Sequence, residues 1–85
     1  MRIELDVPEY SLETGISLDW EEGFTIKSRI ENSSIVIEAN REGLISLARH
    51  LLTLAQIEIP SNSHIHLDEY NSLENESCEI IIERI

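Results

Sequence analysis

The sequence is poor in the residues that build disulfides, thiolate metal sites and phosphate-binding loops. The only cysteine among 85 residues is Cys78, which excludes an intramolecular disulfide and a zinc site made of several thiolates. Three glycines are too few to favour a loop that cradles phosphate. No Cys-x-x-Cys, His-Glu-x-x-His or Gly-x-Ser-x-Gly motif is present. The common catalytic templates are therefore missing, and we expect no cofactor.

Long hydrophobic runs are missing as well. No stretch approaches the roughly 18 apolar residues that would span a bilayer. Residues 1–6 alternate apolar and charged side chains, unlike the apolar segment of a secretory signal. We therefore expect a cytoplasmic protein. With 85 residues, 41% of them hydrophobic, the chain can enclose one core, which predicts a single domain over residues 1–85.

Basic residues are few, and acidic residues dominate the charge. Six Lys and Arg stand against seventeen Asp and Glu, which gives a formal net charge of -11. Seven acids and no base lie between Arg2 and Lys27, and seven more acids and no base lie between Arg49 and Arg84. Such a field repels nucleic acids and anionic membranes and steers basic partners toward the protein. Acidity that serves solubility alone is the alternative interpretation.

Alternating apolar and polar residues predict strands on both sides of one helix. Asn40 is a suitable N-cap, and the apolar residues from Leu44 to Ala55 recur at helical spacing, so a helix is predicted over 41–56 with this stripe on the core. The fold class is therefore α+β, with an antiparallel sheet of about five or six strands and the helix packed across one face, in the order β-β-β-β-α-β-β. The predicted strands cover residues 2–7, 16–21, 24–30, 35–39, 64–68 and 78–83.

One cluster has a chemical appearance, because residues at i, i+2 and i+4 of a strand project from the same face. His64, His66 and Asp68 would stand together there, as two imidazoles and a carboxylate that could ligate Zn²⁺ or a non-haem metal. A metal enzyme usually needs a further group from another element, and none can be assigned. The same three residues also fit the solvated face of an amphipathic strand, or a face that contacts a partner.

Two further residues could carry function but fit the core better. Cys78 is in phase with Ile80 and Ile82, so we expect a buried and inert thiol rather than a nucleophile. Trp20 could be an interface anchor together with Tyr70. Its phase with the apolar residues of 16–21 favours a structural role instead.

The second half of the sequence resembles a known family. Residues 40–85 contain Asn-Arg-Glu-Gly-Leu-Ile-Ser-Leu-Ala-Arg-His from Asn40, then Ser-His-Ile-His-Leu-Asp from Ser63, then a C-terminal Glu-Ile-Ile-Ile-Glu segment. In these motifs the chain is similar to family 32 of the immunity proteins of bacterial polymorphic toxin systems. The resemblance implies a cytoplasmic protein that protects the producing cell by binding the toxin domain of a secreted protein, without catalysis.

Charge and resemblance lead to the same functional hypothesis. Many antibacterial toxins are nucleases with basic grooves, and an acidic protein can fill such a groove. We therefore predict an immunity protein that neutralises a cognate, basic toxin domain, without binding nucleic acid or membrane, and that could also pair as a homodimer. The alternatives are a small metal-dependent enzyme and an acidic module that mimics nucleic acid. The candidate partner-binding residues, on the outer face of the sheet, are His64, His66, Asp68, Tyr70, Glu79 and Glu83.

Overall fold

A computed structural model describes residues 1–85 as an α+β structure with one helix and four short strands. The elements are β1 (Ile26–Glu31), β2 (Ser34–Ala39), α1 (Arg41–Leu54), β3 (His64–Leu67) and β4 (Ile80–Glu83). β1 pairs with β2 and β3 with β4, both antiparallel, in two separate two-stranded sheets. The predicted fold class is confirmed, but the predicted single sheet of five or six strands is wrong. No helix is long and apolar enough to cross a membrane.

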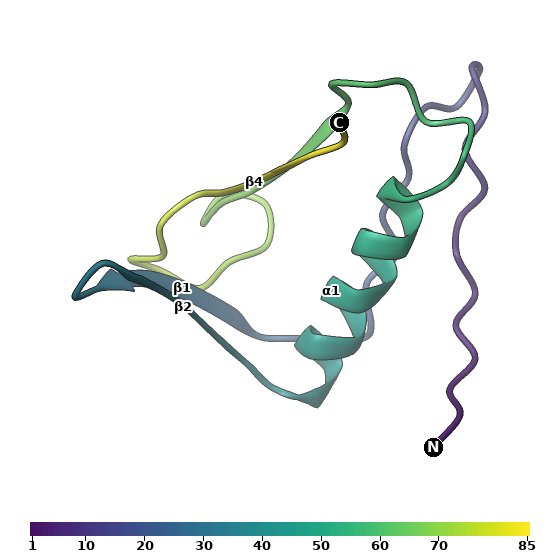
Figure 1. The fold of residues 1–85 in the computed structure, drawn as a ribbon. Coiled ribbons are helices and arrows are strands. Elements are labelled where there is room, and N and C mark those ends of the chain that lie inside the picture. Colours follow the sequence, from purple (N-terminus) through teal and green to yellow (C-terminus); the bar gives the residue numbers. More distant parts are fainter.

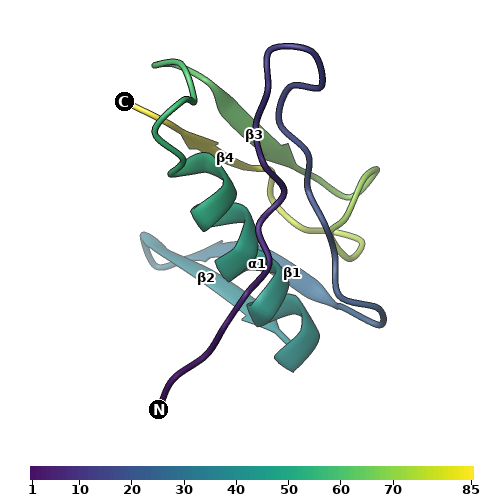
Figure 2. The ribbon, with the colours of Figure 1, turned by 90° about the vertical axis from the view of Figure 1, so that its right-hand side faces the viewer.

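The two hairpins and the helix enclose the core between them. In Figure 1 the hairpins lie close together at one end and diverge toward α1, which spans their far ends. Figure 2 shows the N-terminal segment running along the side of α1 that faces away from the hairpins. The buried centre consists of Ile26, Leu67 and Leu73. Burial of each such side chain contributes roughly 1.5–3 kcal/mol to folding.

The β1–β2 hairpin follows from its turn. Asn32 and Ser33 both adopt positive φ, 49° and 66°, as the two-residue turns that match the twist of a hairpin require. Asn tolerates this region because its side chain bonds locally to the backbone. This turn joins two of the predicted strands, and both strands lie within two residues of their predicted bounds.

The start of α1 is fixed by Asn40 and by a close contact at Gly43. The Asn40 side chain accepts a hydrogen bond from the Gly43 amide at 2.8 Å, which confirms the predicted N-cap. A side chain at Gly43 would place its Cβ 2.5 Å from the Thr25 carbonyl oxygen and 2.9 Å from the Ile26 side chain. Glycine therefore lets the first turn of α1 approach β1 closely.

The helix buries a different face from the predicted one. Apart from Leu54, its buried residues are small or polar: Gly43, Ser46, His50 and Thr53. Leu44, Leu51 and Leu52 are each half exposed or more, so the prediction that the whole stripe from Leu44 to Ala55 packs on the core is wrong. The cause lies in the packing distance, because small residues bring the helix axis closer to β1 than leucines would allow.

The two predicted N-terminal strands are not formed. Residues 1–20 contain only one isolated bridge, between Ser11 and Gly15. The backbone is bonded to side chains of α1 and of the segment just after it instead of a neighbouring strand. Arg49 donates to the Asp6 carbonyl at 3.0 Å, and the Gln56 amide donates to the Pro8 carbonyl at 2.8 Å. Alternation correctly indicates that Leu5 and Val7 are half-buried, but Ile3 is exposed, and the pattern does not supply a ladder partner.

The outer edge of β1 explains why the hairpins do not merge into one sheet. Residues 74–78 run along this edge as a loop, with the Glu74 amide bonded to the Ile26 carbonyl at 2.8 Å and the Cys78 amide to the Ser28 carbonyl at 3.1 Å. After Cys78 this loop leaves the edge of β1 and continues into β4. Cys78 is exposed at this point, so the prediction of a buried thiol is wrong.

Trp20 has the structural role that its phase indicates. It packs against the buried centre, and its indole stacks on Phe24 with ring centroids 4.4 Å apart. His50 approaches the same indole edge-on at 4.2 Å. Trp20 thus fills the space between α1 and the start of β1.

Candidate partner-binding site

The β3–β4 hairpin carries most of the predicted site on its outer face. Ile65 and Leu67 are buried against the helix side, which leaves His64 and His66 exposed on the opposite face. The register pairs His64 with Glu83 and His66 with Ile81 across the two strands. Because directly opposed side chains share a face, strand alternation places both imidazoles beside the outward residues of β4.

Two histidines and two glutamates form the centre of this face. The His64 and His66 rings lie 4.8 Å apart between centroids, and His66 Nδ1 lies 3.1 Å from a Glu79 carboxylate oxygen. Both partners of that contact are about half exposed, so it contributes at most about 1 kcal/mol. Glu83 is exposed and has no ion pair within 4 Å. The arrangement suits a solvated, mainly acidic docking surface.

Asp68 does not join the imidazoles, contrary to the predicted grouping on one strand face. β3 ends at Leu67, and the Asp68 carboxylate accepts the backbone amides of Tyr70 at 2.9 Å and Asn71 at 3.1 Å. The Asp68 amide in turn donates to the Asn71 side chain at 3.0 Å. Asp68 is therefore a turn residue that reverses the chain after β3, as Asp and Asn side chains commonly do.

No metal site is built around these residues. Nowhere in the chain do three or more His, Cys, Asp or Glu side chains cluster so that they could hold a metal ion. His64 Nδ1 lies 3.2 Å from the Asn62 carbonyl, and His66 contacts Glu79. The structure thus brings together His64, His66, Glu79 and Glu83, and leaves Tyr70 exposed beyond the turn.

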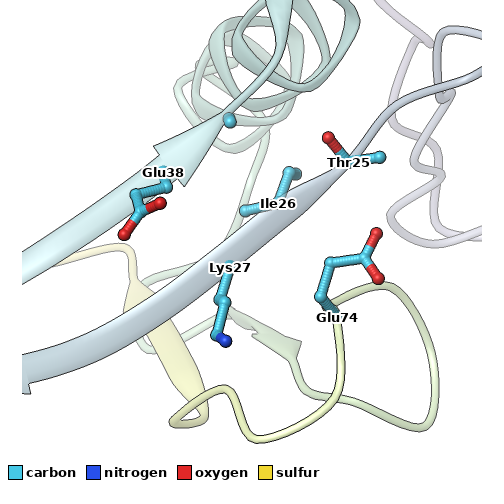
Figure 3. A pocket seen from close by; sticks show the side chains of 6 residues that line it. Thr25, Ile26, Lys27, Glu38 and Glu74 are labelled. Atoms are coloured by element: carbon cyan, nitrogen blue, oxygen red, sulfur yellow. The ribbon is translucent and has the colours of Figure 1, made fainter.

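A shallow hollow of about 290 Å³ lies at the open end of the other hairpin (Figure 3). Its charged residues are Lys27 on β1, Glu38 on β2 and Glu74 in the loop between β3 and β4. Glu38 forms an ion pair with Arg29 of the neighbouring strand. The hollow is exposed and has no buried polar group, so it offers no candidate chemistry.

Exposed isoleucines are the surface feature that the sequence did not predict. Ile30, Ile35 and Ile81 are exposed, with 78% of the Ile35 surface accessible. Two hollows of about 240 and 210 Å³ adjoin β4, one beside the end of α1 and the other beside β1. The alternation in the predicted strands 24–30 and 35–39 did not indicate that Ile30 and Ile35 are exposed. The only available signal was the excess of isoleucine over what so short a chain can bury.

Comparison with protein families gives one match. Residues 34–85, which are 52 of the 85 residues, match the family described as immunity protein 32. The matched region begins at β2 and includes α1 and the whole β3–β4 hairpin. No curated protein and no solved structure matches the chain. The resemblance predicted over residues 40–85 is confirmed.

Proposed function

This chain belongs to the immunity protein 32 family, and from that membership we propose that it binds and neutralises a cognate toxin domain with a basic surface. Family membership is the observation that carries the proposal. A net charge of -11 supports the basic character of the partner, because opposite charge accelerates encounter and matches a groove built for nucleic acid. The protein acts by occupying the toxin and not by catalysis.

The outer face of the β3–β4 hairpin is the proposed centre of contact. His64, His66, Glu79 and Glu83 lie together on this face, and Tyr70, in the turn after β3, is 91% exposed. Aromatic side chains of this kind supply much of the binding energy in protein interfaces. Charged residues at the rim act mainly on the association rate.

The test uses the toxin domain encoded beside this protein in the genome. Binding is measured by stopped-flow fluorescence of Trp20 in increasing NaCl. We expect the association rate to fall by about tenfold or more as the salt screens the steering field, while the dissociation rate changes little. An association rate that is insensitive to salt would contradict the electrostatic part, and no complex at all would contradict the function.

Charge reversal at the face identifies the contact residues. Glu83→Lys should slow association several-fold and weaken the complex. Glu58→Lys makes the same charge change in the exposed loop after α1, outside the proposed face, and serves as the matched control. Equal effects of both variants would assign the result to net charge alone. The homodimer stays a prediction, which light scattering of the free protein checks.

The nucleic-acid mimic is distinguished by its selectivity. A general mimic would compete with duplex DNA for several unrelated basic proteins, since the phosphate charge and not the sequence governs such binding. An immunity protein should leave those proteins bound to DNA and displace only its own toxin. Gel-shift competition with a histone and with the toxin domain separates the two.

A further inference from the structure

One edge of β4 has no neighbour. β4 is hydrogen-bonded to β3 alone, and the pairing continues to Arg84, whose amide donates to the Ser63 carbonyl at 2.7 Å. In an antiparallel pair every second residue of a strand bonds to the partner strand. The backbone groups of Ile80 and Ile82, like those of Arg84, therefore point toward β3. The backbone N–H and C=O groups of Ile81 and Glu83 therefore point to the free edge.

Apolar hollows lie along both halves of this edge. The hollow of about 240 Å³ separates the C-terminal half of β4 from the last turns of α1, and the hollow of about 210 Å³ separates its N-terminal half from β1. Their apolar walls include Leu51, Leu54 and Ile82 in the first, and Ile30, Ile35 and Ile80 in the second. The strand edge thus runs between two apolar depressions on the side that faces α1.

The opposite side of the edge is acidic. Glu79 and Glu83 alternate with Ile81 on the outward face, and all three are exposed. The two arginines near the hollows are already engaged. Arg29 pairs with Glu31 and Glu38, and Arg84 donates to two carbonyls at the end of α1. A segment added here would therefore meet the exposed carboxylates of Glu79 and Glu83 on one face and apolar walls on the other.

This charge pattern disfavours a second copy of the chain as the occupant. Antiparallel self-pairing about Ile81 would set Glu79 of one copy opposite Glu83 of the other, twice. Like charges directly opposed across strands are destabilising, and each molecule carries a net charge of -11. The complementary occupant is an extended segment that alternates apolar residues with Lys or Arg.

We propose that the free edge of β4 accepts such a segment of a basic partner as an added antiparallel strand. Its apolar side chains enter the two hollows, and its basic side chains face Glu79 and Glu83. This is strand addition to an exposed sheet edge, in which the backbone provides affinity and the side-chain pockets provide specificity. The inference rests on the proposed function in one respect, that the partner supplying the segment is the toxin.

The test uses the full-length protein and a blocked synthetic peptide of alternating Lys and Val. In the added strand, the lysines lie on the same face as Glu79 and Glu83 and directly opposite β4 residues such as Ile81 and Glu83, whose backbone groups point to the free edge. The backbone amides of the lysines therefore form the new hydrogen bonds to β4. N-methylation of the lysine amides should reduce binding at least tenfold. N-methylation of the valine amides, which point away from β4, is the matched control and should change binding only a few-fold.

Hydrogen exchange locates the added strand. On peptide binding the amides of Ile81 and Glu83 should gain protection, whereas those of Ile80 and Ile82 are already protected in the free protein. No binding of the unmethylated peptide, equal effects of the two methylations, or protection elsewhere would overturn the inference. Self-association of the free protein with protection at Ile81 would assign the edge to a second copy and overturn it as well.

The same measurement separates this inference from the proposed function. If the toxin domain binds but leaves the Ile81 and Glu83 amides unprotected, strand addition fails and the immunity function stands. If the peptide binds as expected while the toxin does not, the edge is a docking site and the proposed function fails. The two failures therefore have different signatures.

Discussion

Acid should destabilise this protein through one buried histidine. His50 lies on the buried face of α1 with 0% of its surface exposed, and neither ring nitrogen has a hydrogen-bond partner. Burial, helped by the positive charge of Arg49 and partly opposed by Asp19, lowers the pKa of His50 from 6.5 to about 4. The folded protein therefore holds the imidazole neutral, against the edge of the Trp20 ring.

The sign and size of the effect follow from linkage. Because the folded pKa is below the unfolded one, the unfolded chain binds more protons between pH 4 and 6.5. Stability is then fully present above pH 6.5 and is lost as the pH falls toward 4. At about 1.4 kcal/mol for each pH unit in that window, the loss reaches at most about 3 kcal/mol. That is a large share of the roughly 5–15 kcal/mol that stabilises a typical domain.

Urea unfolding followed by Trp20 fluorescence at pH 7, 6, 5 and 4 measures this loss. The comparison is made between variants at each pH, so that the effect of His50 is separated from other effects of acid. In His50→Leu the slope between pH 6.5 and 4 should be flatter than in the unmodified protein. His64→Leu replaces an exposed histidine and should leave the slope unchanged. Identical slopes for the protein and its His50→Leu variant would refute the assignment.

Three substitutions test the packing and capping that hold α1, all by urea unfolding. Gly43→Ala should destabilise the protein by about 1–2 kcal/mol, because the new Cβ would lie 2.5 Å from the Thr25 carbonyl oxygen. Alanine ordinarily favours a helix over glycine, so a stabilised variant would contradict that contact. Asn40→Ala should lower the free energy of unfolding by about 1–2 kcal/mol, because the helix loses its N-cap hydrogen bond. A negligible change would show that water replaces this bond. Arg84→Met keeps an apolar side chain but loses the hydrogen bond to the Leu54 carbonyl at 3.1 Å, and should lower the free energy of unfolding by about 1 kcal/mol. An unchanged urea midpoint would argue against a stabilising role for this bond.

The start of the helix, the turn of the β1–β2 hairpin and the faces of β3 were predictable because their signals are local. Asn40 caps the helix through its own side chain, and Asn32 and Ser33 supply the positive φ angles of the hairpin turn. Alternation in β3 separates buried Ile65 and Leu67 from the exposed histidines. Each of these outcomes depends on neighbours within a few residues, which sequence patterns report directly.

Pairing partners were not predictable, since they depend on distant residues. Residues 2–7 alternate as a strand would, yet their backbone is bonded to Arg49 of α1. The face of α1 was assigned from its leucines, whereas Gly43 and Ser46 set the contact with the preceding segment, where the Glu21 amide donates to Ser46 at 2.8 Å. Hydrophobicity favoured the leucines, but close approach selected the small side chains.

Within the candidate site, the same difference between local and distant contacts decides which residues meet. His64 and His66 share a face by strand geometry alone, but Asp68 is drawn away by two backbone amides of its own turn. The side chain of an aspartate that follows a short strand can either continue the strand face or accept hydrogen bonds from the backbone of the turn. Here the turn prevails, which removes the carboxylate that a three-ligand metal site on this strand would need.

The acidity and the exposed isoleucines of this protein have opposite physical effects. Isoleucines at a free strand edge promote association with any passing strand, while a net charge of -11 repels other copies of the same chain and most acidic proteins. Glu79 and Glu83 apply that repulsion directly at the β4 edge. In the proposed strand addition, this charge at the edge favours a partner segment that is itself positive and disfavours acidic segments.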